Sequence, residues 1–350
     1  MENSSDKLIS FCIPNFNYGN YIDATLNSLS QQNDKDFEVV ISDNCSTDNS
    51  IEVIKKWESN FKYFRYTQNK VNIGFGGNLD KASKLATGIY IVMLSSDDLV
   101  EADAVFEYKK FIKIVEDKNP NEKFFFGGQP KMIDSEGQFI QNMNKGNQLW
   151  FETDIDKSLS DDMGFKVYKV PSHEMLRRCL INFKTPLHFI TVCYQHASYL
   201  AVEGYGGARL YNPDKWFHWK LMVEVDFVYY LDSPLFQYRW HNNNQANQQQ
   251  QNQILKYWID EYRNCFEVTN EMLNKSGLSS GSIAQNFTDR CIIPYVYKHL
   301  KEGNRLLAKR ILHFGLSCYP TQLKKNKFYY PMYILCGIPF SNLLLSKFNK

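Results

Sequence analysis

The sequence predicts an α/β protein with a mostly parallel sheet covered by helices on both faces. Short apolar runs alternate with helix-like segments through the first hundred residues. This β-α-β-α order is typical of parallel sheets. Polar residues gather directly after the apolar runs, where open parallel sheets bind their ligands. These two observations define the fold class and indicate where a site would lie.

Four strands and three helices are predicted in residues 8–100. The strands are expected at 8–13, 37–42, 63–67 and 89–94, where apolar and β-branched residues are continuous. Each intervening helix has one apolar face, formed by Ile22, Leu26 and Leu29, by Ile51, Ile54 and Trp57, and by Leu79, Ala82 and Ala86. Asn20 is in position to cap the first helix, and Gly88 to end the third.

The pattern changes after residue 100. A helix near 101–117 leads to an apolar run at 124–128, and residues 134–137 (DSEG) predict a hairpin turn. Residues 140–165 are polar and irregular, which predicts a loop. Helical residues follow at 172–183, then a short segment near 188–194.

An Asn/Gln-rich run at 242–253 predicts the main boundary of the chain. Residues 1–241 would form the α/β domain, with halves at 1–100 and 101–241. Residues 242–350 would form a helical C-terminal extension, because 254–317 has the pattern of two or three helices. The apolar tail is flanked by lysines and could lie on an anionic membrane surface or pack as an ordinary helix.

Composition excludes several classes of protein. The chain has 350 residues, with 40 Lys and Arg against 38 Asp and Glu, and this balance lacks the basic footprint of a nucleic-acid binder. None of the eight cysteines forms a CxxC pair, which argues against a zinc site. The N-terminus has no apolar signal core, and no stretch reaches the ~18 apolar residues of a spanning helix. We therefore expect a cytoplasmic protein that is soluble or peripheral at the inner membrane.

Three carboxylates follow the predicted strands. Asp43 comes after the second strand, and Asp97 and Asp98 come after the fourth. Since the carboxyl ends of parallel strands meet at one edge, these side chains should face a common crevice. Carboxylates without thiols favour Mg²⁺ or Mn²⁺, which can neutralise a diphosphate leaving group. Helix capping by Asp97 and Asp98, and an Asx turn at Asp43, are the alternatives for each residue alone.

Four motifs in order resemble glycosyltransferase family 2, whose members have the GT-A fold. They are SFCIPNFN, ISDNCSTDNS, NKVNIGFGGN and IVMLSSDD, and they cover residues 8–100, with a looser resemblance over 185–241. The bacterial transferases that build O-antigen or capsule are the most similar in character. The resemblance implies an inverting transfer of a hexose or deoxyhexose from a nucleotide-diphosphate-sugar to a saccharide or lipid-linked saccharide. QYRW at 237–240 is one residue short of the QxxRW of processive synthases, and no spanning helix is expected, so a single, non-processive addition fits better. UDP is the nucleotide expected from family frequency.

The resemblance also implies roles for individual residues. Pro14, Asn17, Asp43, Asn72 and Asp97 would bind the donor, with Asp43 at the base. Asp98 would bind a divalent cation, Mn²⁺ or Mg²⁺. Ser95 departs from the commoner Asp-x-Asp-Asp pattern.

The second half supplies three further candidates by the same resemblance. Asp214 follows Pro213 where relatives have a Glu-Asp pair, and would be the catalytic base that deprotonates the acceptor. His241, in QYRWHNNN, would reach the metal or diphosphate. Trp216 would stack on the acceptor sugar, although core packing explains an aromatic residue equally well.

Other nucleotide-binding folds lack their signatures here. No G-x-G-x-x-G follows the first strand, which argues against a dehydrogenase, and no Walker motif occurs. The remaining alternative is a catalytically inactive relative that binds nucleotide or glycan, which the departures at Ser95 and Pro213 would allow.

Overall fold

The computed structural model describes residues 9–143, 149–206, 213–241, 244 and 254–339. It divides the chain into two compact units. Unit 1 comprises 1–175 and 185–257, and unit 2 comprises 176–184 and 258–350. Within the described residues, no helix has both the length and the apolar character needed to cross a bilayer.

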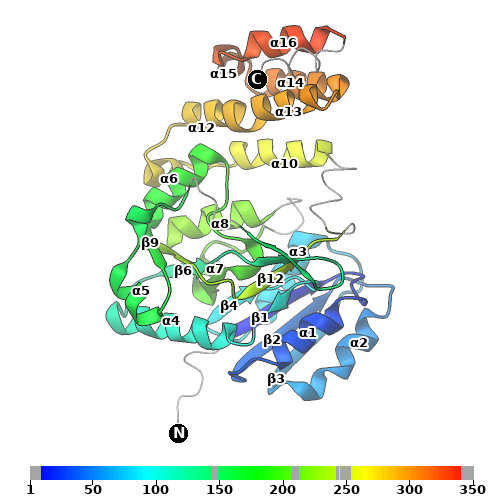
Figure 1. Ribbon diagram of the computed structural model, residues 1–350, viewed down its shortest axis with the longest axis vertical. Coiled ribbons are helices and arrows are strands. Elements are labelled where there is room, and N and C mark those ends of the chain that lie inside the picture. The colour runs from blue at the N-terminus through cyan, green and yellow to red at the C-terminus, as the bar shows by residue number, and fades with distance from the viewer. Residues whose placement is uncertain (1–8, 144–148, 207–212, 242–243, 245–253, 340–350) are drawn as a thin grey trace. The chain divides into compact units, whose positions relative to one another are not determined.

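An eight-stranded sheet forms the centre of unit 1, in the order β3-β2-β1-β4-β10-β6-β11-β9 (Figure 1). Strands β3, β2, β1 and β4 pair in parallel, as do β6 and β11, whereas β10 and β9 pair antiparallel with their neighbours. The prediction of a mostly parallel α/β sheet is therefore confirmed. The strands are β1 (Ile9–Asn15), β2 (Phe37–Asp43), β3 (Tyr63–Gln68), β4 (Tyr90–Met93), β6 (Phe124–Gly127), β9 (Val167–Pro171), β10 (Cys193–Gln195) and β11 (Phe227–Leu231).

Helices cover both faces of this sheet, because successive strand residues point to opposite sides. The odd-numbered residues of β1, such as Phe11, join a core with α1 (Ile22–Ser30), α2 (Ser50–Lys56) and α4 (Ala104–Lys118). On the other face, the Cys12 thiol contacts a carbonyl of α3 (Phe75–Leu85). Tyr194 of β10 packs there against Phe217 of α8 (Pro213–Glu224). Helices α5 (Lys157–Met163) and α7 (His196–Ala201) also belong to unit 1, whereas α6 (Ser172–Asn182) passes into unit 2 after Met175.

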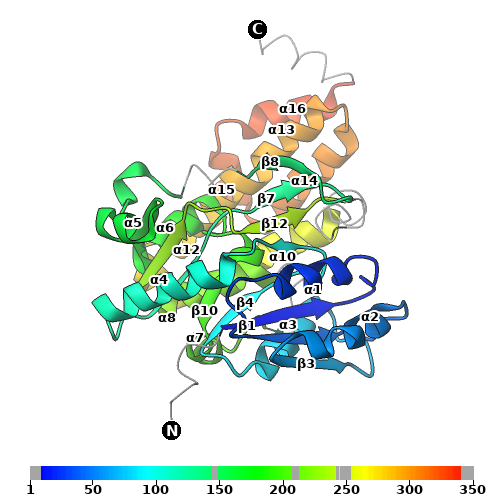
Figure 2. The ribbon, with the colours of Figure 1, turned by 60° about the horizontal axis from the view of Figure 1, so that its bottom comes forward.

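A smaller four-stranded sheet lies beside the carboxyl end of β4 (Figure 2). Its order is β5-β12-β7-β8, with strands β5 (Leu99–Val100), β12 (Phe236–Arg239), β7 (Lys131–Ile133) and β8 (Phe139–Asn142). The predicted hairpin turn joins β7 to β8, and Gly137 adopts the positive φ of 85° that this turn needs. This sheet brings β12, from the end of unit 1, next to the segment that follows β4.

Three local expectations were wrong. Gly88 does not end α3, which stops at Leu85 with Ala86 as its C-cap. Asn20 does not cap α1, whose N-cap is Tyr21 without a side-chain hydrogen bond. Residues 140–165 are not wholly irregular, since they contain the short helices η2 (Glu152–Asp154) and α5. The Asp156 side chain caps α5 by accepting from the Leu159 amide, and Gly164 ends it with a left-handed φ of 84°. Cap and stop are both visible in the sequence, but the helix between them is only two turns long.

Unit 2 is helical, as predicted for the C-terminal extension. Its helices include α11 (Asn270–Ser276), α12 (Ser280–Phe287), α13 (Ile293–Lys301), α14 (Arg305–Cys318), α15 (Pro320–Lys325) and α16 (Tyr329–Gly337). Helix α10 (Ile254–Phe266) crosses the boundary between the units, and a π-helical turn, Thr288–Ile292, connects α12 to α13. These helices outnumber the two or three expected over 254–317, because short turns divide the apolar pattern.

Candidate functional site

The carboxyl end of β1 separates two polar networks. Strand β1 pairs with β2 on one side, with Asn15 opposite Asp43, and with β4 on the other, with Cys12 opposite Met93. The first network is built around Asp43, and the second around Asp97 and Asp98. Parallel pairing places both at the same edge of the sheet, where ligands bind in open α/β folds.

Asp43 is fully buried and accepts hydrogen bonds at both carboxylate oxygens. The Asn15 amide donates to Oδ1 over 2.7 Å, and the Ser46 hydroxyl donates to the same oxygen over 2.5 Å. The Ser46 backbone amide donates to Oδ2 over 2.9 Å. Asp43 thus holds the loop after β2 against the end of β1.

Asn17 and Asn72 join neighbouring loops to the same network. Asn17 has a positive φ of 58°, and its side-chain oxygen accepts from the Thr47 amide over 2.8 Å. The Asn72 oxygen accepts from Asn44 over 2.9 Å and from the Gly74 amide, just before α3. The predicted donor-binding residues Asn17, Asp43 and Asn72 therefore lie in three loops that are hydrogen-bonded to one another.

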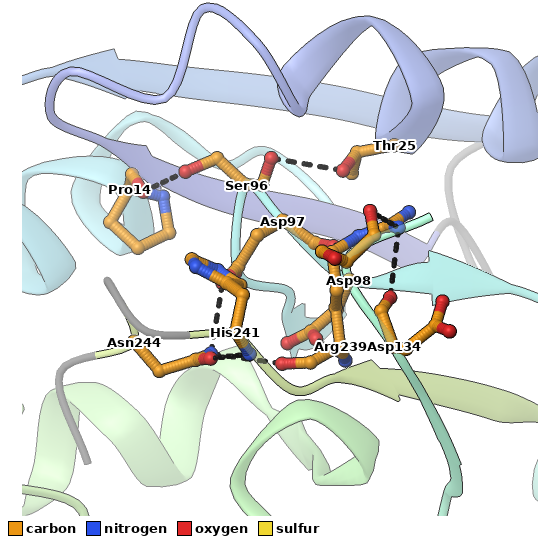
Figure 3. A network of polar contacts seen from close by, with 10 residues as sticks. Pro14, Thr25, Ser96, Asp97, Asp98, Asp134, Arg239, His241 and Asn244 are labelled. Carbon is orange, nitrogen blue, oxygen red and sulfur yellow. Dashed lines mark hydrogen bonds and ion pairs between the residues drawn. The ribbon is translucent and has the colours of Figure 1, made fainter. Parts of the chain in front are cut away.

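The second network begins with the segment after β4 (Figure 3). The Ser96 hydroxyl donates to the Pro14 carbonyl over 3.2 Å, and the Ser96 carbonyl accepts from Thr25 of α1. These bonds attach the segment to the end of β1 and present Asp97 and Asp98 beside it. Pro14 therefore lies between the two networks, but it contributes its backbone rather than its side chain.

Asp97 contacts two residues that follow β12. Its Oδ2 lies 2.9 Å from the Nε2 of His241 and accepts from the Asn244 amide over 3.3 Å. Tyr21 of α1 stacks on the His241 ring, with centroids 4.6 Å apart. Asp97, His241 and Asn244 are all buried, so these contacts are shielded from water. The structure thus brings His241 to the acidic pair across 144 residues of sequence.

Asp98 differs from its neighbour because one of its oxygens is unsatisfied. Oδ1 accepts from the Arg239 backbone amide over 2.8 Å, whereas Oδ2 is buried without a hydrogen-bond partner among the described residues. Burial raises the pKa of Asp98 well above its usual value, and the Asp97 carboxylate raises it further. The Arg239 amide and the Ser95 hydroxyl lower it in part. An open, buried carboxylate oxygen is a position at which a cation would be favoured.

Arg239 clamps this segment to the second sheet. Its Nε donates to the Asp97 carbonyl over 2.8 Å, and its Nη1 donates to the carbonyls of Asp134 and Ser135 in the β7–β8 hairpin. The guanidinium also lies 5.5 Å from the centre of the Tyr21 ring. Figure 3 shows Arg239 between the acidic pair and Asp134. Among the described residues, these guanidinium bonds go to backbone carbonyls, which suits a role in positioning the turn.

The other candidate residues lie on α8, in unit 1. Asp214 is in the first turn of this helix and is partly exposed, whereas Trp216 is buried with 9% of its surface exposed. Loss of surrounding water raises the pKa of Asp214, and Lys215 lowers it in part. Among the residues that the structure describes, no contact joins Asp214 or Trp216 to Asp98. Residues 207–212, which precede α8, lie outside the described ranges.

Two residues of this site were not identified from the sequence. Arg239 was visible only within QYRW, which falls one residue short of the QxxRW motif, and nothing in it indicated a bond to the Asp97 carbonyl. Asn244 belongs to the Asn/Gln-rich run, where composition does not distinguish it from its neighbours, and it contacts Asp97. A motif that joined the two positions, Arg-x-His-x-x-Asn, would have been the useful signal.

Comparison with known proteins identifies the family that the first part of the chain resembles. Residues 10–149 match the sequence profile of the family described as Glycosyl transferase family 2. Abequosyltransferase RfbV of Salmonella typhimurium is 40% identical over 101 residues, which are 28% of this chain and 30% of that protein. Poly(ribitol-phosphate) beta-N-acetylglucosaminyltransferase TarS of Staphylococcus aureus is 31% identical over 106 residues, 29% of this chain and 18% of that protein. The matches thus span less than a third of each of these two relatives.

Solved structures are similar in fold over nearly the whole chain. The crystal structure of S. aureus TarS 1-349 in complex with UDP-GlcNAc aligns with a TM-score of 0.57 and 18% identity, over 94% of this chain and 79% of that one. A mannosyltransferase from Pyrobaculum calidifontis, in complex with GDP-Man and Mn²⁺, aligns with a TM-score of 0.51 and 12% identity, over 99% and 88%. Residues 10–149 thus match glycosyl transferase family 2, and the chain has the GT-A fold of the aligned structures.

Proposed function

We propose that this protein is an inverting, non-processive glycosyltransferase that moves a monosaccharide from a nucleotide-diphosphate-sugar to a saccharide or lipid-linked saccharide. The observation that carries the proposal is the unsatisfied, buried Oδ2 of Asp98, placed beside Asp97 and His241 at the ligand-binding edge of the sheet. A buried carboxylate oxygen without a partner costs free energy, and a site that binds a ligand there recovers that cost.

The donor nucleotide is assigned to the Asp43 side of β1. Asn17, Asp43 and Asn72 are tied together in loops that end three parallel strands, which suits the recognition of a nucleoside. Pro14 and Asp97 would then lie towards the ribose and diphosphate. A UDP-sugar is our first choice, in line with the UDP-GlcNAc complex of the aligned TarS structure.

The residues present fit a divalent cation only in part. Among the described residues, no three His, Cys, Asp or Glu side chains come together as a complete metal site. Asp98 nevertheless offers an open, hard oxygen, and Mg²⁺ and Mn²⁺ commonly take their remaining ligands from water and substrate phosphates. We assign Asp98 and His241 to holding Mn²⁺ or Mg²⁺, which would neutralise the charge of the departing diphosphate.

The transfer itself is a single displacement. The acceptor hydroxyl oxygen bonds to the anomeric carbon while the bond from that carbon to the diphosphate oxygen breaks. The proton of the hydroxyl passes to Asp214, whose raised pKa makes it a better base than an exposed carboxylate. Trp216, one turn along α8 from Pro213, is assigned to the acceptor side.

The cellular context follows from the relatives. RfbV is an abequosyltransferase, and TarS acts on poly(ribitol-phosphate), so we propose a role in bacterial surface polysaccharide synthesis on the cytoplasmic side of the membrane.

A donor panel tests the proposal directly. Purified protein is incubated with UDP-, GDP-, CDP- and dTDP-sugars, with and without Mn²⁺, and release of nucleoside diphosphate is measured alongside thermal stabilisation. We expect one donor both to stabilise the protein and to be slowly hydrolysed, and Asp98→Asn to abolish turnover. Stabilisation without turnover for every donor, with saccharide acceptors also supplied, would instead identify an inactive nucleotide-binding relative.

A further inference from the structure

Helix α16 in unit 2 is apolar on all sides but only half of it is covered. Its nine residues, YYPMYILCG, contain no charged side chain. Tyr329, Met332 and Cys336 face inwards and are buried. On the opposite face, the exposed fractions are 61% for Tyr330, 52% for Tyr333 and 59% for Ile334. A helix that is apolar all round is usually covered on every side, by protein or by lipid.

The surrounding sequence is strongly basic. From residue 303 to the end, the chain has eight Lys and Arg and no Asp or Glu. The rest of the chain therefore has 32 basic against 38 acidic residues, out of totals of 40 and 38. The net charge of +2 is therefore the sum of a positive segment from residue 303 onward and a negative remainder, residues 1–302. Such asymmetry indicates contact with an anionic partner.

Exposed cations lie at both ends of α16. Lys324, Lys325 and Lys327 precede its first turn, and all three are exposed. At the other end, Arg305 of α14 donates to the Gly337 carbonyl over 3.2 Å. Burial raises the pKa of the Cys336 thiol, and the nearby charge of Lys309, one turn further along α14, lowers it in part. The exposed apolar face is thus bounded by positive charge along the helix axis.

We infer that α16 docks on an anionic lipid surface, with Tyr330, Tyr333 and Ile334 in the interface and the flanking cations at the headgroups. At nine residues the helix is far too short to span a bilayer, but its length, aromatic content and basic ends suit a helix that lies in the interface plane. Lysine and arginine there contribute by attraction to acidic headgroups. This inference does not depend on the proposed transfer reaction.

Charge and apolarity together distinguish lipid from the other possible occupants. A nucleic acid would use the lysines, but it would not cover an aliphatic and aromatic face that offers no hydrogen bonds. A second copy of the chain would bring eight more cations to the same place, and like charges oppose that pairing. An anionic bilayer satisfies both the apolar face and the cations.

Vesicle sedimentation with the full chain tests the inference. We expect the protein to sediment with vesicles of phosphatidylglycerol and phosphatidylethanolamine, but not with phosphatidylcholine, and to be released as salt rises from about 0.1 M to about 0.5 M. The triple variant Tyr330→Ser, Tyr333→Ser, Ile334→Ser should bind at least about tenfold more weakly. The variant Lys324→Gln, Lys325→Gln, Lys327→Gln should lose about a hundredfold, at about fivefold per lysine.

Two matched controls make the result specific. Ile259→Ser with Phe266→Ser removes similarly exposed apolar residues from α10 and should leave binding unchanged. Lys55→Gln, Lys56→Gln, Lys84→Gln removes three exposed lysines from unit 1 and should have little effect. Circular dichroism confirms that each variant is folded.

Several outcomes would overturn the inference. They are absence of binding to anionic vesicles, equal binding to phosphatidylcholine, and unchanged binding of the α16 apolar variant. Sedimentation velocity without lipid tests whether the same face joins two copies of the chain. An oligomer that only the α16 apolar variant dissociates would assign the face to that contact. Tighter binding to an oligonucleotide than to vesicles, unaffected by the apolar variant, would assign the surface to nucleic acid.

Discussion

The two sides of β1 handle buried carboxylates in opposite ways. On the β2 side, Asp43 accepts three hydrogen bonds from Asn15 and Ser46, so both of its oxygens are occupied. On the β4 side, Asp98 has one oxygen bonded to the Arg239 amide and one without a partner among the described residues. Both carboxyl groups are fully buried, so burial alone does not distinguish them.

This difference suggests that Asp43 has a structural role, whereas Asp98 is available to bind a ligand. A carboxylate whose oxygens are occupied by its own loop stabilises that loop, and presents a fixed surface to a ligand. A buried carboxylate with an empty oxygen destabilises the apo protein and is retained where a ligand needs it. We therefore expect substitutions on the two sides to affect different measurements, stability on the Asp43 side and turnover on the Asp98 side.

The largest effect is expected at Asp98. Asp98→Asn keeps an oxygen for the Arg239 amide but removes the negative charge, so kcat should fall by about 10³–10⁴-fold, as several kcal/mol of charge stabilisation are lost. The unfolding temperature should stay constant or rise, because a buried acid with a raised pKa is replaced by a neutral isostere. Steady-state kinetics and calorimetry check both parts. If Asp98→Asn instead lost much of its stability but kept normal turnover, Asp98 would have the structural role assigned to Asp43.

A third carboxylate, Asp214, belongs to neither network. Its substitution tests whether the catalytic base is a different residue from the proposed metal ligands Asp98 and His241. Asp214→Asn should lower kcat by at least about 10²-fold while leaving Mn²⁺ dependence unchanged. In the unmodified protein, the base works only when ionised. Its pKa, raised by burial, therefore predicts that kcat/KM falls with decreasing pH through a value higher than the ordinary pKa of an aspartate. A pH–rate profile measures this, and an unchanged acidic limb in Asp214→Asn would remove the residue from its role.

An intermediate effect is expected at Arg239, which positions the acidic turn without touching the reacting atoms. Arg239→Lys keeps the charge and the backbone amide but cannot reproduce the bonds to both the Asp97 carbonyl and the β7–β8 hairpin. We expect kcat/KM to fall by about tenfold to a hundredfold, at about 1–2 kcal/mol for each imperfect contact. Gln237→Ala on the same strand, whose side chain contacts Glu101, is the control and should retain activity. Equal losses in the two variants would indicate general damage to β12.

The smallest effect on turnover, and the clearest on stability, is expected at Asp43. Asp43→Asn places an amide donor among the donors of Asn15 and Ser46, so the free energy of unfolding should fall by about 1–3 kcal/mol. KM for the donor should rise while kcat changes little. Urea titration and donor kinetics measure the two quantities, with Asp98→Asn as the stability control. If Asp43→Asn were as stable as the unmodified protein, Asp43 would not have the structural role proposed for it.

The sequence predicted the first half of the molecule well because its signals are local. Continuous apolar runs predict β1 to β4, and the polar residues that follow them mark the binding edge of the sheet. The proximity of Asp43 to the end of β1 follows from parallel pairing alone. The helical character of the C-terminal part followed from its apolar periodicity.

The parts that could not be predicted depend on contacts between distant residues. Arg239 reaches Asp97 and the β7–β8 hairpin only because β12 pairs with β7 in parallel, and no short motif encodes that pairing. Asn244 lies in a run of similar residues, so composition could not single it out. The unsatisfied oxygen of Asp98 is a property of packing, and it exists only once the surrounding chain has excluded water. The roles of Asp214 and Trp216, of Asp98 and His241, and of the donor-binding residues all remain predictions.

The shared end of β1 also bears on how this protein could change over evolution. Asn15 anchors one loop and the Pro14 carbonyl anchors the other, so a one-residue insertion between Ile13 and Asn15 would disturb both polar networks at once. Insertions at the tip of the β7–β8 hairpin, near Glu136, would leave that anchor untouched. Homologues with altered sugar preference should therefore vary in length at the hairpin and keep a constant length across residues 13–15.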